Sequence, residues 1–260
     1  MSMKVRLDFG NLPLVETAIR ASFKSGIDLG FSRITAIHRE LQGSFPLAEE
    51  LKNYEAAPGI AEQIELGPGQ IHGVVFAGNK NGLRITLQRH VVVVRWVKQP
   101  IGDSPIYPRY PLLRKTLWDV VARVKSVFAP DFLPAVVNMS YVNFIPVENF
   151  ASVLSDYFSQ LVHVQALDGA DQIMKVEFAW REQITGIEVR FRLEKVSVPI
   201  NDKTEDGCRL TTIAGKHIFD AHRTADEELD EVHARLQAFF RDALSERAKS
   251  EWDLKEVPIA

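Results

Sequence analysis

The stretch that decides the fold is 83–97, with the sequence LRITLQRHVVVVRWV. Its first six residues alternate between apolar and polar side chains: Leu83, Ile85 and Leu87 against Arg84, Thr86 and Gln88. A period of two is typical of a strand with one buried face and one wet face. The valines at 91–94 are apolar on both faces, and Asn81-Gly82 before the stretch is a strong hairpin signal. The stretch therefore predicts neighbouring antiparallel strands, the first with a polar face in water.

Similar patterns on both sides extend this prediction to the whole chain. Alternating apolar residues predict strands over 12–24, 71–77, 134–145, 174–180, 187–198 and 209–222. Apolar residues at helical spacing predict helices over 34–45, 111–128, 150–161 and 229–243. Ser32 is the expected N-cap of the first helix, and Thr224–Glu227 has the spacing of a capping box before the last. The apolar phase changes after Leu193, which predicts a β-bulge near Glu194-Lys195.

The element order repeats in the two halves of the chain, 1–130 and 131–260, as β-α-β-β-β-α. The opening strands match at an offset of 134 − 13 = 121 residues, with a proline, a valine and a phenylalanine in register. We therefore expect an α+β fold in which a single domain of two pseudo-repeats forms one antiparallel sheet with the helices packed on one face. This order resembles the duplicated TATA-binding-protein-like and helix-grip folds, and a fold does not by itself determine function.

Composition limits the possible classes of function. The 260 residues are 46% hydrophobic and 25% charged, as in ordinary globular proteins. A formal net charge of −3 weakens the case for a dedicated nucleic-acid binder. No apolar run reaches the roughly 18 residues of a membrane span, and Asp8 and Glu16 stand where a secretory signal needs apolar residues. The single cysteine, Cys208, excludes an intrachain disulfide and favours a cytoplasmic location.

The motifs of several common chemistries are missing. The chain has no Walker A loop, because Gly215-Lys216 is followed by His217, and it has no G-x-S-x-G elbow. Its seven histidines are dispersed, so we expect no metal site and no cofactor. Cys208 is expected to act as a small hydrophobic residue, and Asp220 with His222 is interpreted as a polar strand end. We therefore assign no catalytic residue.

Arginines on the expected strands form the first candidate binding surface. If the helices cover one side of the sheet, three polar sets share the other side: Arg84, Thr86 and Gln88; Glu188, Arg190, Arg192 and Glu194; Lys175, Glu177 and Arg181. Arginine is suited to bidentate grips on carboxylates or phosphates. The alternative is a solvated face on which arginine and glutamate ladders satisfy each other.

A loop beside the sheet forms the second candidate. It combines Arg89 and His90 with Tyr107, Arg109 and Tyr110, and Pro105 and Pro108 shape it. Tyrosine and arginine are favoured anchors at protein interfaces. The alternative is that these residues tie down the loop and cover the edge of the core. Glu16 and Arg20, four residues apart on the first strand, are expected to form a structural ion pair.

Five short motifs occur together in this order: Pro13-Leu14-Val15-Glu16, Leu87-Gln88-Arg89 running into Val94-Arg95-Trp96, Tyr107-Pro108-Arg109-Tyr110, Tyr141-Val142-Asn143-Phe144-Ile145-Pro146 and Glu251-Trp252-Asp253. In these motifs the chain resembles a sporadically distributed bacterial family with no assigned activity. The resemblance covers nearly the whole chain. It implies an accessory role, such as an antitoxin-like component of a defence or toxin–antitoxin locus, and it transfers no catalytic residue.

Three hypotheses follow for the function. The first is a non-enzymatic interaction module that binds another protein. The second is a small-ligand binder or enzyme with a pocket between the sheet and the long loop 46–70, since loops of this length are either functional or partly structured. The third is nucleic-acid binding on the arginine-bearing sheet face. A homodimer is compatible with each, and no membrane partner is expected.

Overall fold

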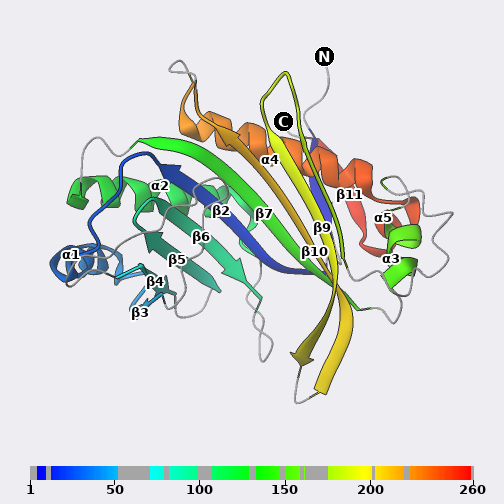
Figure 1. Ribbon diagram of the computed structural model, residues 1–260, viewed down its shortest axis with the longest axis horizontal. Coiled ribbons are helices and arrows are strands. Elements are labelled where there is room, and N and C mark those ends of the chain that lie inside the picture. The colour runs from blue at the N-terminus through cyan, green and yellow to red at the C-terminus, as the bar shows by residue number, and fades with distance from the viewer. Residues whose placement is uncertain are drawn as a thin grey trace. The chain divides into compact units, whose positions relative to one another are not determined.

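The computed structural model describes residues 5–9, 13–51, 71–78, 82–98, 107–128, 133–146, 150–158, 161, 175–200, 203–219 and 223–258. It is an α+β structure with an antiparallel sheet of nine strands in the order β3-β4-β5-β6-β2-β7-β10-β9-β8 (Figure 1). The expected fold class is confirmed at this level. Within the described residues, no helix is long and apolar enough to cross a membrane.

Packing divides the chain into two compact units. The first unit comprises Glu16–Met139 and Lys216–Leu229. The second unit comprises Met1–Val15, Ser140–Gly215 and Asp230–Ala260. Each unit is described by itself below.

The first unit is built on a run of antiparallel strands: β2 (Leu14–Phe23), β3 (Leu47–Glu50), β4 (Gly73–Ala77), β5 (Leu83–Gln88) and β6 (Val91–Val97). The hairpin expected before β5 is consistent with Gly82, whose φ of 66° lies in the left-handed region that glycine adopts without strain. One face of β4, β5, β6 and most of β2 is buried and includes Ile19, Phe76 and Ile85, whereas β3 is exposed. These residues come from three different strands, so the alternating pattern does build a common core.

Two helices cover the first unit, α1 (Phe31–Leu41) and α2 (Arg109–Phe128). The His38 ring of α1 stacks on Phe76 of β4 at 5.8 Å between centroids, and α2 packs against both α1 and β6. The stripe predicted for α2 is buried at Leu113, Leu117, Val120, Val121 and Val124. Ser32 is not the cap that it was predicted to be: α1 begins one residue after Gly30, and no side chain caps it.

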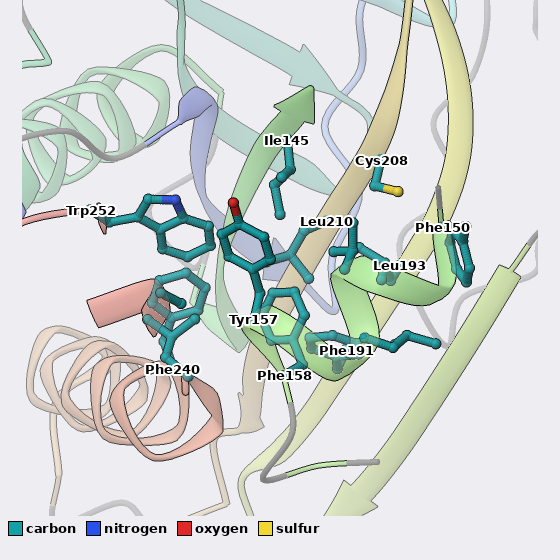
Figure 2. Close-up of a cluster of buried hydrophobic side chains, with 14 residues drawn as sticks. Ile145, Phe150, Tyr157, Phe158, Phe191, Leu193, Cys208, Leu210, Phe240 and Trp252 are labelled. Carbon is teal, nitrogen blue, oxygen red and sulfur yellow. The ribbon is translucent and has the colours of Figure 1, made fainter. Parts of the chain in front are cut away.

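The second unit contains β8 (Lys175–Arg181), β9 (Glu188–Ile200), β10 (Lys203–His217) and the last part of β7 (Pro134–Pro146). Its helices are α3 (Phe150–Tyr157), α5 (Glu246–Glu251) and most of α4 (Ala225–Ala243). Buried side chains from these helices meet those of β9 and β10 in one cluster (Figure 2), and its strand side is formed by Phe191, Leu193 and Leu210. The helices thus pack on the face of β9 and β10 that carries these three residues.

The start of α4 follows the sequence closely, whereas the last predicted strand, 209–222, is observed as β10 from Lys203 to His217. Thr224 and Glu227 form the expected capping box: the Glu227 amide donates to Thr224 Oγ1 at 3.2 Å, and the Thr224 amide donates to Glu227 Oε2 at 2.8 Å. The bond from the Thr224 amide, followed by a 3.0 Å bond from the Thr224 hydroxyl to Glu227 Oε2, lowers the pKa of Glu227. Asp220 and His222, interpreted as a polar strand end, lie outside the described residues.

The predicted β-bulge near Glu194-Lys195 is wrong. β9 and β10 pair in one unbroken register from Lys203–Ile200 to Gly215–Glu188. The apolar phase changes because Val196 and Val198 lie on the other face of the same regular ribbon, where both are half-buried. A change of apolar phase can therefore mark a change of buried face rather than an extra residue.

Four elements were not predicted, and one of them is β3, which lies in the stretch 46–70 that was expected to be an irregular loop. β1 (Val5–Phe9) pairs with β11 (Leu254–Pro258) in a separate two-stranded sheet, and α5 follows α4 directly. Ser245 is the N-cap of α5, since its hydroxyl accepts a hydrogen bond from the Ala248 amide at 3.1 Å. A fifth helix is thus added to the expected four.

Candidate functional site

Where β8, β9 and β10 lie side by side, over residues 175–181, 188–194 and 209–215, one face carries eight charged side chains, which we call the charged face: Lys175, Glu177, Arg181, Glu188, Arg190, Arg192, Glu194 and Arg209. Seven of these were predicted to share a face, and the structure brings them together. The strand register sets opposite charges across from each other: Lys175 faces Glu194, Glu177 faces Arg192, and Arg181 faces Glu188. Such pairs stabilise the sheet, whereas like charges in these positions would destabilise it.

Ion pairs also run along the strands of the charged face. Glu188 contacts Arg190 at 2.9 Å, and Lys175 contacts Glu177 at 2.5 Å. The hydrogen bond from Lys175 lowers the pKa of Glu177. The four side chains of these two pairs are 40% to 48% exposed. The alternative reading, in which arginine and glutamate ladders satisfy each other, therefore describes this face correctly, although its side chains remain open to a partner.

Glu194 is the central acceptor of the charged face. Its side chain is only 12% exposed, and it accepts hydrogen bonds from Arg209 Nε at 2.6 Å and from Arg192 Nη2 at 2.5 Å. Burial alone raises the pKa of Glu194, but the bonds from Arg209 and Arg192 outweigh it and lower that pKa. Arg209 was not among the predicted residues. The alternation of Arg209, Thr211 and Ile213 along the last strand is the signal that could have found it.

Thr86 and Gln88 do not lie on a wet face as predicted. Arg84 is exposed, but Thr86 is 5% and Gln88 is 1% exposed. Their cross-strand neighbours on β6 are Val93 and Val91, which are buried with Ala18 in a small second cluster. The four valines at 91–94 were the sequence feature that indicated this burial, because a strand that is apolar on both faces must have both faces covered.

Gln88 also lies against a glycine that has no room for a side chain. A Cβ atom on Gly73 would meet the Leu87 carbonyl oxygen at 2.8 Å and Gln88 Cγ at 3.0 Å. Gly73 is the register partner of Gln88 on β4. Because Gly73 has no side chain, the aliphatic part of the Gln88 side chain can pack against the Gly73 backbone. Gln88 is therefore part of a packed interior rather than an accessible contact residue.

Arg89 and His90 form the turn between β5 and β6 and hold the segment that follows β2. The Ile27 amide donates to the Arg89 carbonyl at 2.7 Å, and the Phe23 amide donates to the His90 carbonyl at 2.9 Å. Both side chains also lie close to Gly26, where an added Cβ would meet them within 2.9 Å. These contacts favour the structural alternative, in which the turn anchors its surroundings.

The Tyr107–Tyr110 segment also has clear packing partners. The Tyr107 ring meets Trp96 edge-on at 5.4 Å between centroids, and Tyr110 is buried at 9% exposure. Arg109 is exposed and has a φ of 65°, a backbone conformation that costs a non-glycine residue about 1–3 kcal/mol. Of the three aromatic and basic residues, Arg109 is thus the one that presents its side chain to solvent.

The motifs of the first unit meet through Glu16 and Arg95. Glu16 was expected to pair with Arg20, and the structure places its carboxylate 3.1 Å from Arg95 Nε on the neighbouring strand. The residue after Arg95 is Trp96, whose ring contacts the ring of Tyr107. Three of the five motifs noted in the sequence therefore contact each other across long sequence separations. These contacts indicate that the motif residues stabilise the packing of the first unit.

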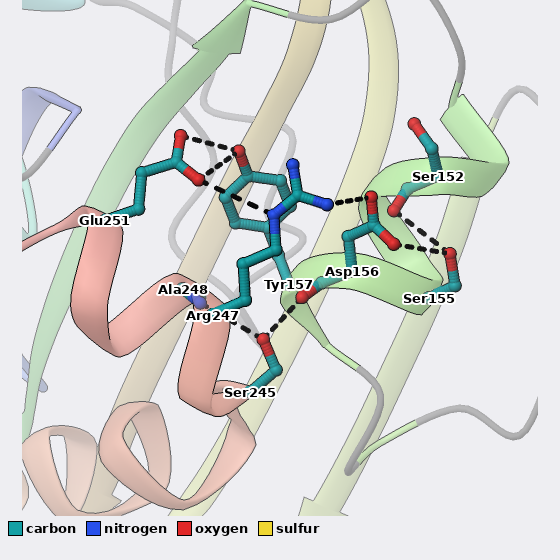
Figure 3. Close-up of polar contacts among 8 residues, drawn as sticks. All are labelled: Ser152, Ser155, Asp156, Tyr157, Ser245, Arg247, Ala248 and Glu251. Carbon is teal, nitrogen blue, oxygen red and sulfur yellow. Dashed lines mark hydrogen bonds and ion pairs between the residues drawn. The ribbon is translucent and has the colours of Figure 1, made fainter.

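A polar network of the second unit joins α3 to α5 (Figure 3). The Tyr157 hydroxyl donates to Glu251 at 2.8 Å, and Arg247 contacts Asp156 at 2.7 Å while its guanidinium lies over the Tyr157 ring. The Ser245 hydroxyl donates to the Asp156 carbonyl oxygen. Burial, followed by the bond to Glu251, raises the pKa of Tyr157 to about 12. Tyr157 therefore stays protonated near neutral pH and serves as a structural donor.

Two features of the described residues bear on catalysis: the placement of the metal-ligating side chains and the burial of Cys208. Among them, no group of three or more His, Cys, Asp and Glu side chains is arranged to hold a metal ion. Cys208 is fully buried in the core of the second unit, and burial raises the pKa of its thiol to about 11. A buried, protonated thiol is a poor nucleophile.

Comparison of the sequence with protein-family models and with curated proteins found no match. The candidate residues divide between the two units: Arg190 and Arg192 in the second; Arg84, Gln88, Arg89, Tyr107, Arg109 and Tyr110 in the first. Arg190 and Arg192 belong to the charged face, whereas Arg84 is exposed across from Arg95, which pairs with Glu16.

Proposed function

We propose that the protein is a non-enzymatic interaction module that binds another protein through the charged face of β8, β9 and β10. The observation that carries this proposal is the register of that face, in which exposed opposite charges alternate across three neighbouring strands. Rigid strands hold the charged groups at fixed spacing, so a partner with the complementary pattern gains contacts at little entropic cost.

The mixed signs favour a protein partner over a nucleic acid. The charged face has five cations and three carboxylates. A phosphate backbone would have to separate Arg190 from Glu188, and Arg192 and Arg209 from Glu194, and it would then meet the released carboxylates. A protein surface that carries both acidic and basic side chains can form a new ion pair with each arginine and each glutamate that it separates. Nucleic-acid binding is thus the weaker of the two alternatives.

The small-ligand alternative depends on the long loop 46–70. Residues 47–50 form the exposed strand β3, and Leu51 lies against Gly73. Positions 52–70 lie outside the described residues, so the proposed pocket has no further support. Metabolite screening tests it directly, because a ligand at a hundred times its Kd adds about 2.7 kcal/mol to the free energy of unfolding.

The experiment for the proposed function compares binding partners of the wild type and of the double variant Arg190→Gln/Arg192→Gln. Tagged full-length protein is recovered from its own cells, bound proteins are quantified by mass spectrometry, and the main partner is purified for a Kd measurement. We expect at least about tenfold weaker binding by the double variant, since charged pairs at an interface contribute about 1.4 kcal/mol or more.

Arg123→Gln is the matched control. Arg123 lies on α2 in the first unit, and its side chain is 46% exposed beside Glu40. The Arg123→Gln substitution therefore removes an exposed, paired arginine without altering the charged face. Equal binding by the wild type and the double variant refutes the proposal. Salt-dependent DNA or RNA binding that the double variant loses would support the nucleic-acid alternative instead.

The internal duplication belongs to the same proposal. In residues 1–130, β2 is the strand that precedes α1, and it pairs with β6, the last strand before α2. In residues 131–260, β7 opens the half and neighbours β10, the last strand before α4. This shared connectivity supports two pseudo-repeats of a TATA-binding-protein-like or helix-grip-like unit. An experimental structure in which β2 and β6 fail to superpose on β7 and β10 would refute it.

The biological setting that we propose is an accessory, antitoxin-like role in the bacterial cytoplasm. It rests on the motif resemblance and on the single cysteine. An adjacent reading frame encoding a toxin-like or nuclease-like protein would support this setting and would name the partner to test first.

A further inference from the structure

Strand β8 is an edge strand that has charged side chains on one face but neither a proline nor a bulge to prevent pairing. It stands last in the strand order and pairs with β9 alone among the described strands. Its seven residues contain no proline, and its register with β9 is unbroken, so no bulge bends it away. Natural edge strands commonly use proline, bulges or shortness to prevent pairing with another chain.

Two large aromatic side chains stand partly in water on this edge. Phe178 is 37% and Trp180 is 38% exposed, although Phe178 contacts Phe191 and Trp180 contacts Phe239. The aromatic residues occupy one face of β8, and Lys175, Glu177 and Arg181 occupy the other. The edge therefore presents an apolar row and a charged row, and no strand of the described part of the chain pairs with its outer side.

We propose that β8 pairs with β8 of a second copy of this chain, antiparallel and centred on Ala179. A twofold axis at Ala179 sets Glu177 of one copy across from Arg181 of the other, and it does so twice. The same register sets Phe178 across from Trp180, also twice. Opposite charges and aromatic pairs in directly opposed positions stabilise antiparallel strands. This inference goes beyond the proposed function, because it needs no other protein.

Neighbouring registers lack this complementarity. A centre at Phe178 sets Lys175 across from Arg181, and a centre at Glu177 sets that carboxylate across from its own copy. Both juxtapose like charges, which destabilise a strand pair. The sequence of β8 is therefore self-complementary in the register centred on Ala179.

The mass of the purified full-length protein in solution tests the association. Light scattering after size-exclusion chromatography, over about 1–100 µM, should give a mass approaching twice the 29.3 kDa of one chain. A mass of one chain at about 100 µM would overturn the proposal. Binding of a separate partner through Arg190 and Arg192 is unaffected by this result, so the two proposals fail independently.

Cysteine cross-linking tests the register. Ala179 is exposed and would face its own copy, where directly opposed Cβ atoms are about 4.5–5.5 Å apart. Ala179→Cys should form a disulfide-linked dimer under mild oxidation, and the native Cys208 is buried and gives little background. The control is Ala234→Cys, at an exposed position on α4. Equal cross-linking of the two variants would overturn the register.

A charge swap gives a second test that does not use a cysteine. Glu177→Arg and Arg181→Glu should each weaken the dimer about tenfold, since each sets like charges together at both ends. The double variant restores the pairing and should return to within about threefold of the wild type. Thermal unfolding of each variant shows whether it folds. Folded single variants with unchanged dimerisation, or a double variant without rescue, would overturn the proposal.

Discussion

Replacing Trp252 by alanine tests whether the aromatic cluster holds the helices of the second unit in place. Trp252 is 4% exposed, and its ring centroid lies 5.5 Å from that of Tyr157, 6.0 Å from Phe240 and 6.4 Å from Phe158 (Figure 2). These partners come from α3, from α4 and from the residue after α3. Truncation therefore removes the side chain that several helical segments share.

The expected cost follows from the size of the cavity. Truncating a buried aromatic residue to alanine costs about 3–5 kcal/mol, a range that includes the lost transfer energy and the cavity. Three ring contacts are lost together, each worth about 0.5–1.5 kcal/mol beyond buried area. We therefore expect Trp252→Ala to lower the free energy of unfolding by about 4 kcal/mol, a large share of the about 5–15 kcal/mol typical of a domain.

Urea denaturation followed by circular dichroism measures this loss as a lower midpoint. The control is Phe219→Ala, because Phe219 is also an aromatic residue but is 82% exposed and stacks only on an imidazole in the described structure. Its cost should stay within about 0.5 kcal/mol. A loss below about 1 kcal/mol for Trp252→Ala, or equal losses for both variants, would refute the reasoning.

Three further outcomes are expected. Lys216→Met removes the 2.6 Å partner of the Glu228 carboxylate, which is 2% exposed, and leaves Arg223 at 3.4 Å from it. It should lower the free energy of unfolding by about 2–3 kcal/mol, against less than about 0.5 kcal/mol for Lys115→Met in an exposed pair. Similar denaturation midpoints for the two variants would contradict this. Burial raises the folded pKa of Tyr157 from 10.0 to about 12, so the unfolded chain releases the phenol proton first. The wild type should therefore lose stability relative to Tyr157→Phe between pH 10 and about 12, and a difference independent of pH would argue against it. Burial also raises the pKa of Cys208 to about 11, so a thiol reagent at about pH 8 should label it only in denaturant, and rapid labelling of the native protein would count against the buried site.

The strands and long helices could be predicted because their periodicity is local. The alternation in β5 and the stripe of α2 each require only the geometry of one element, and both were located correctly. The capping box at Thr224 and Glu227 was also predictable, since its hydrogen bonds close within four residues.

Two of the errors involve strand neighbours that are distant in sequence, and one is a local error at a helix start. Gln88 has the polar character of a surface residue, and it is buried because Val91 and Gly73 are its register partners. Ser32 looked like a cap, but α1 starts after Gly30. The phase change after Leu193 looked like a bulge, but β10 continues in register beside it. For Gln88 and for the phase change, the deciding contact includes a neighbouring strand that the local pattern does not show, whereas the start of α1 is a local boundary that was placed two residues too late.

The candidate surface was predicted in part. Period-two spacing placed Arg190 and Arg192 on one face, but pairing decided which glutamates they meet. Glu194 receives Arg209 from β10, a residue fifteen positions away that the charge pattern of β9 does not reveal. The Tyr157–Glu251 contact joins residues 94 positions apart and could not be inferred from either helix alone.

By itself, the sequence determined the α+β class, the order of the main elements and the face on which each side chain of a regular element lies, because backbone geometry repeats every two or 3.6 residues. Only the tertiary structure decided which faces are covered and which charges are matched. Burial and ion pairing depend on which residue lies on the neighbouring strand or beneath the helix. The spacing of residues within one element does not determine which distant residue the fold brings to that position.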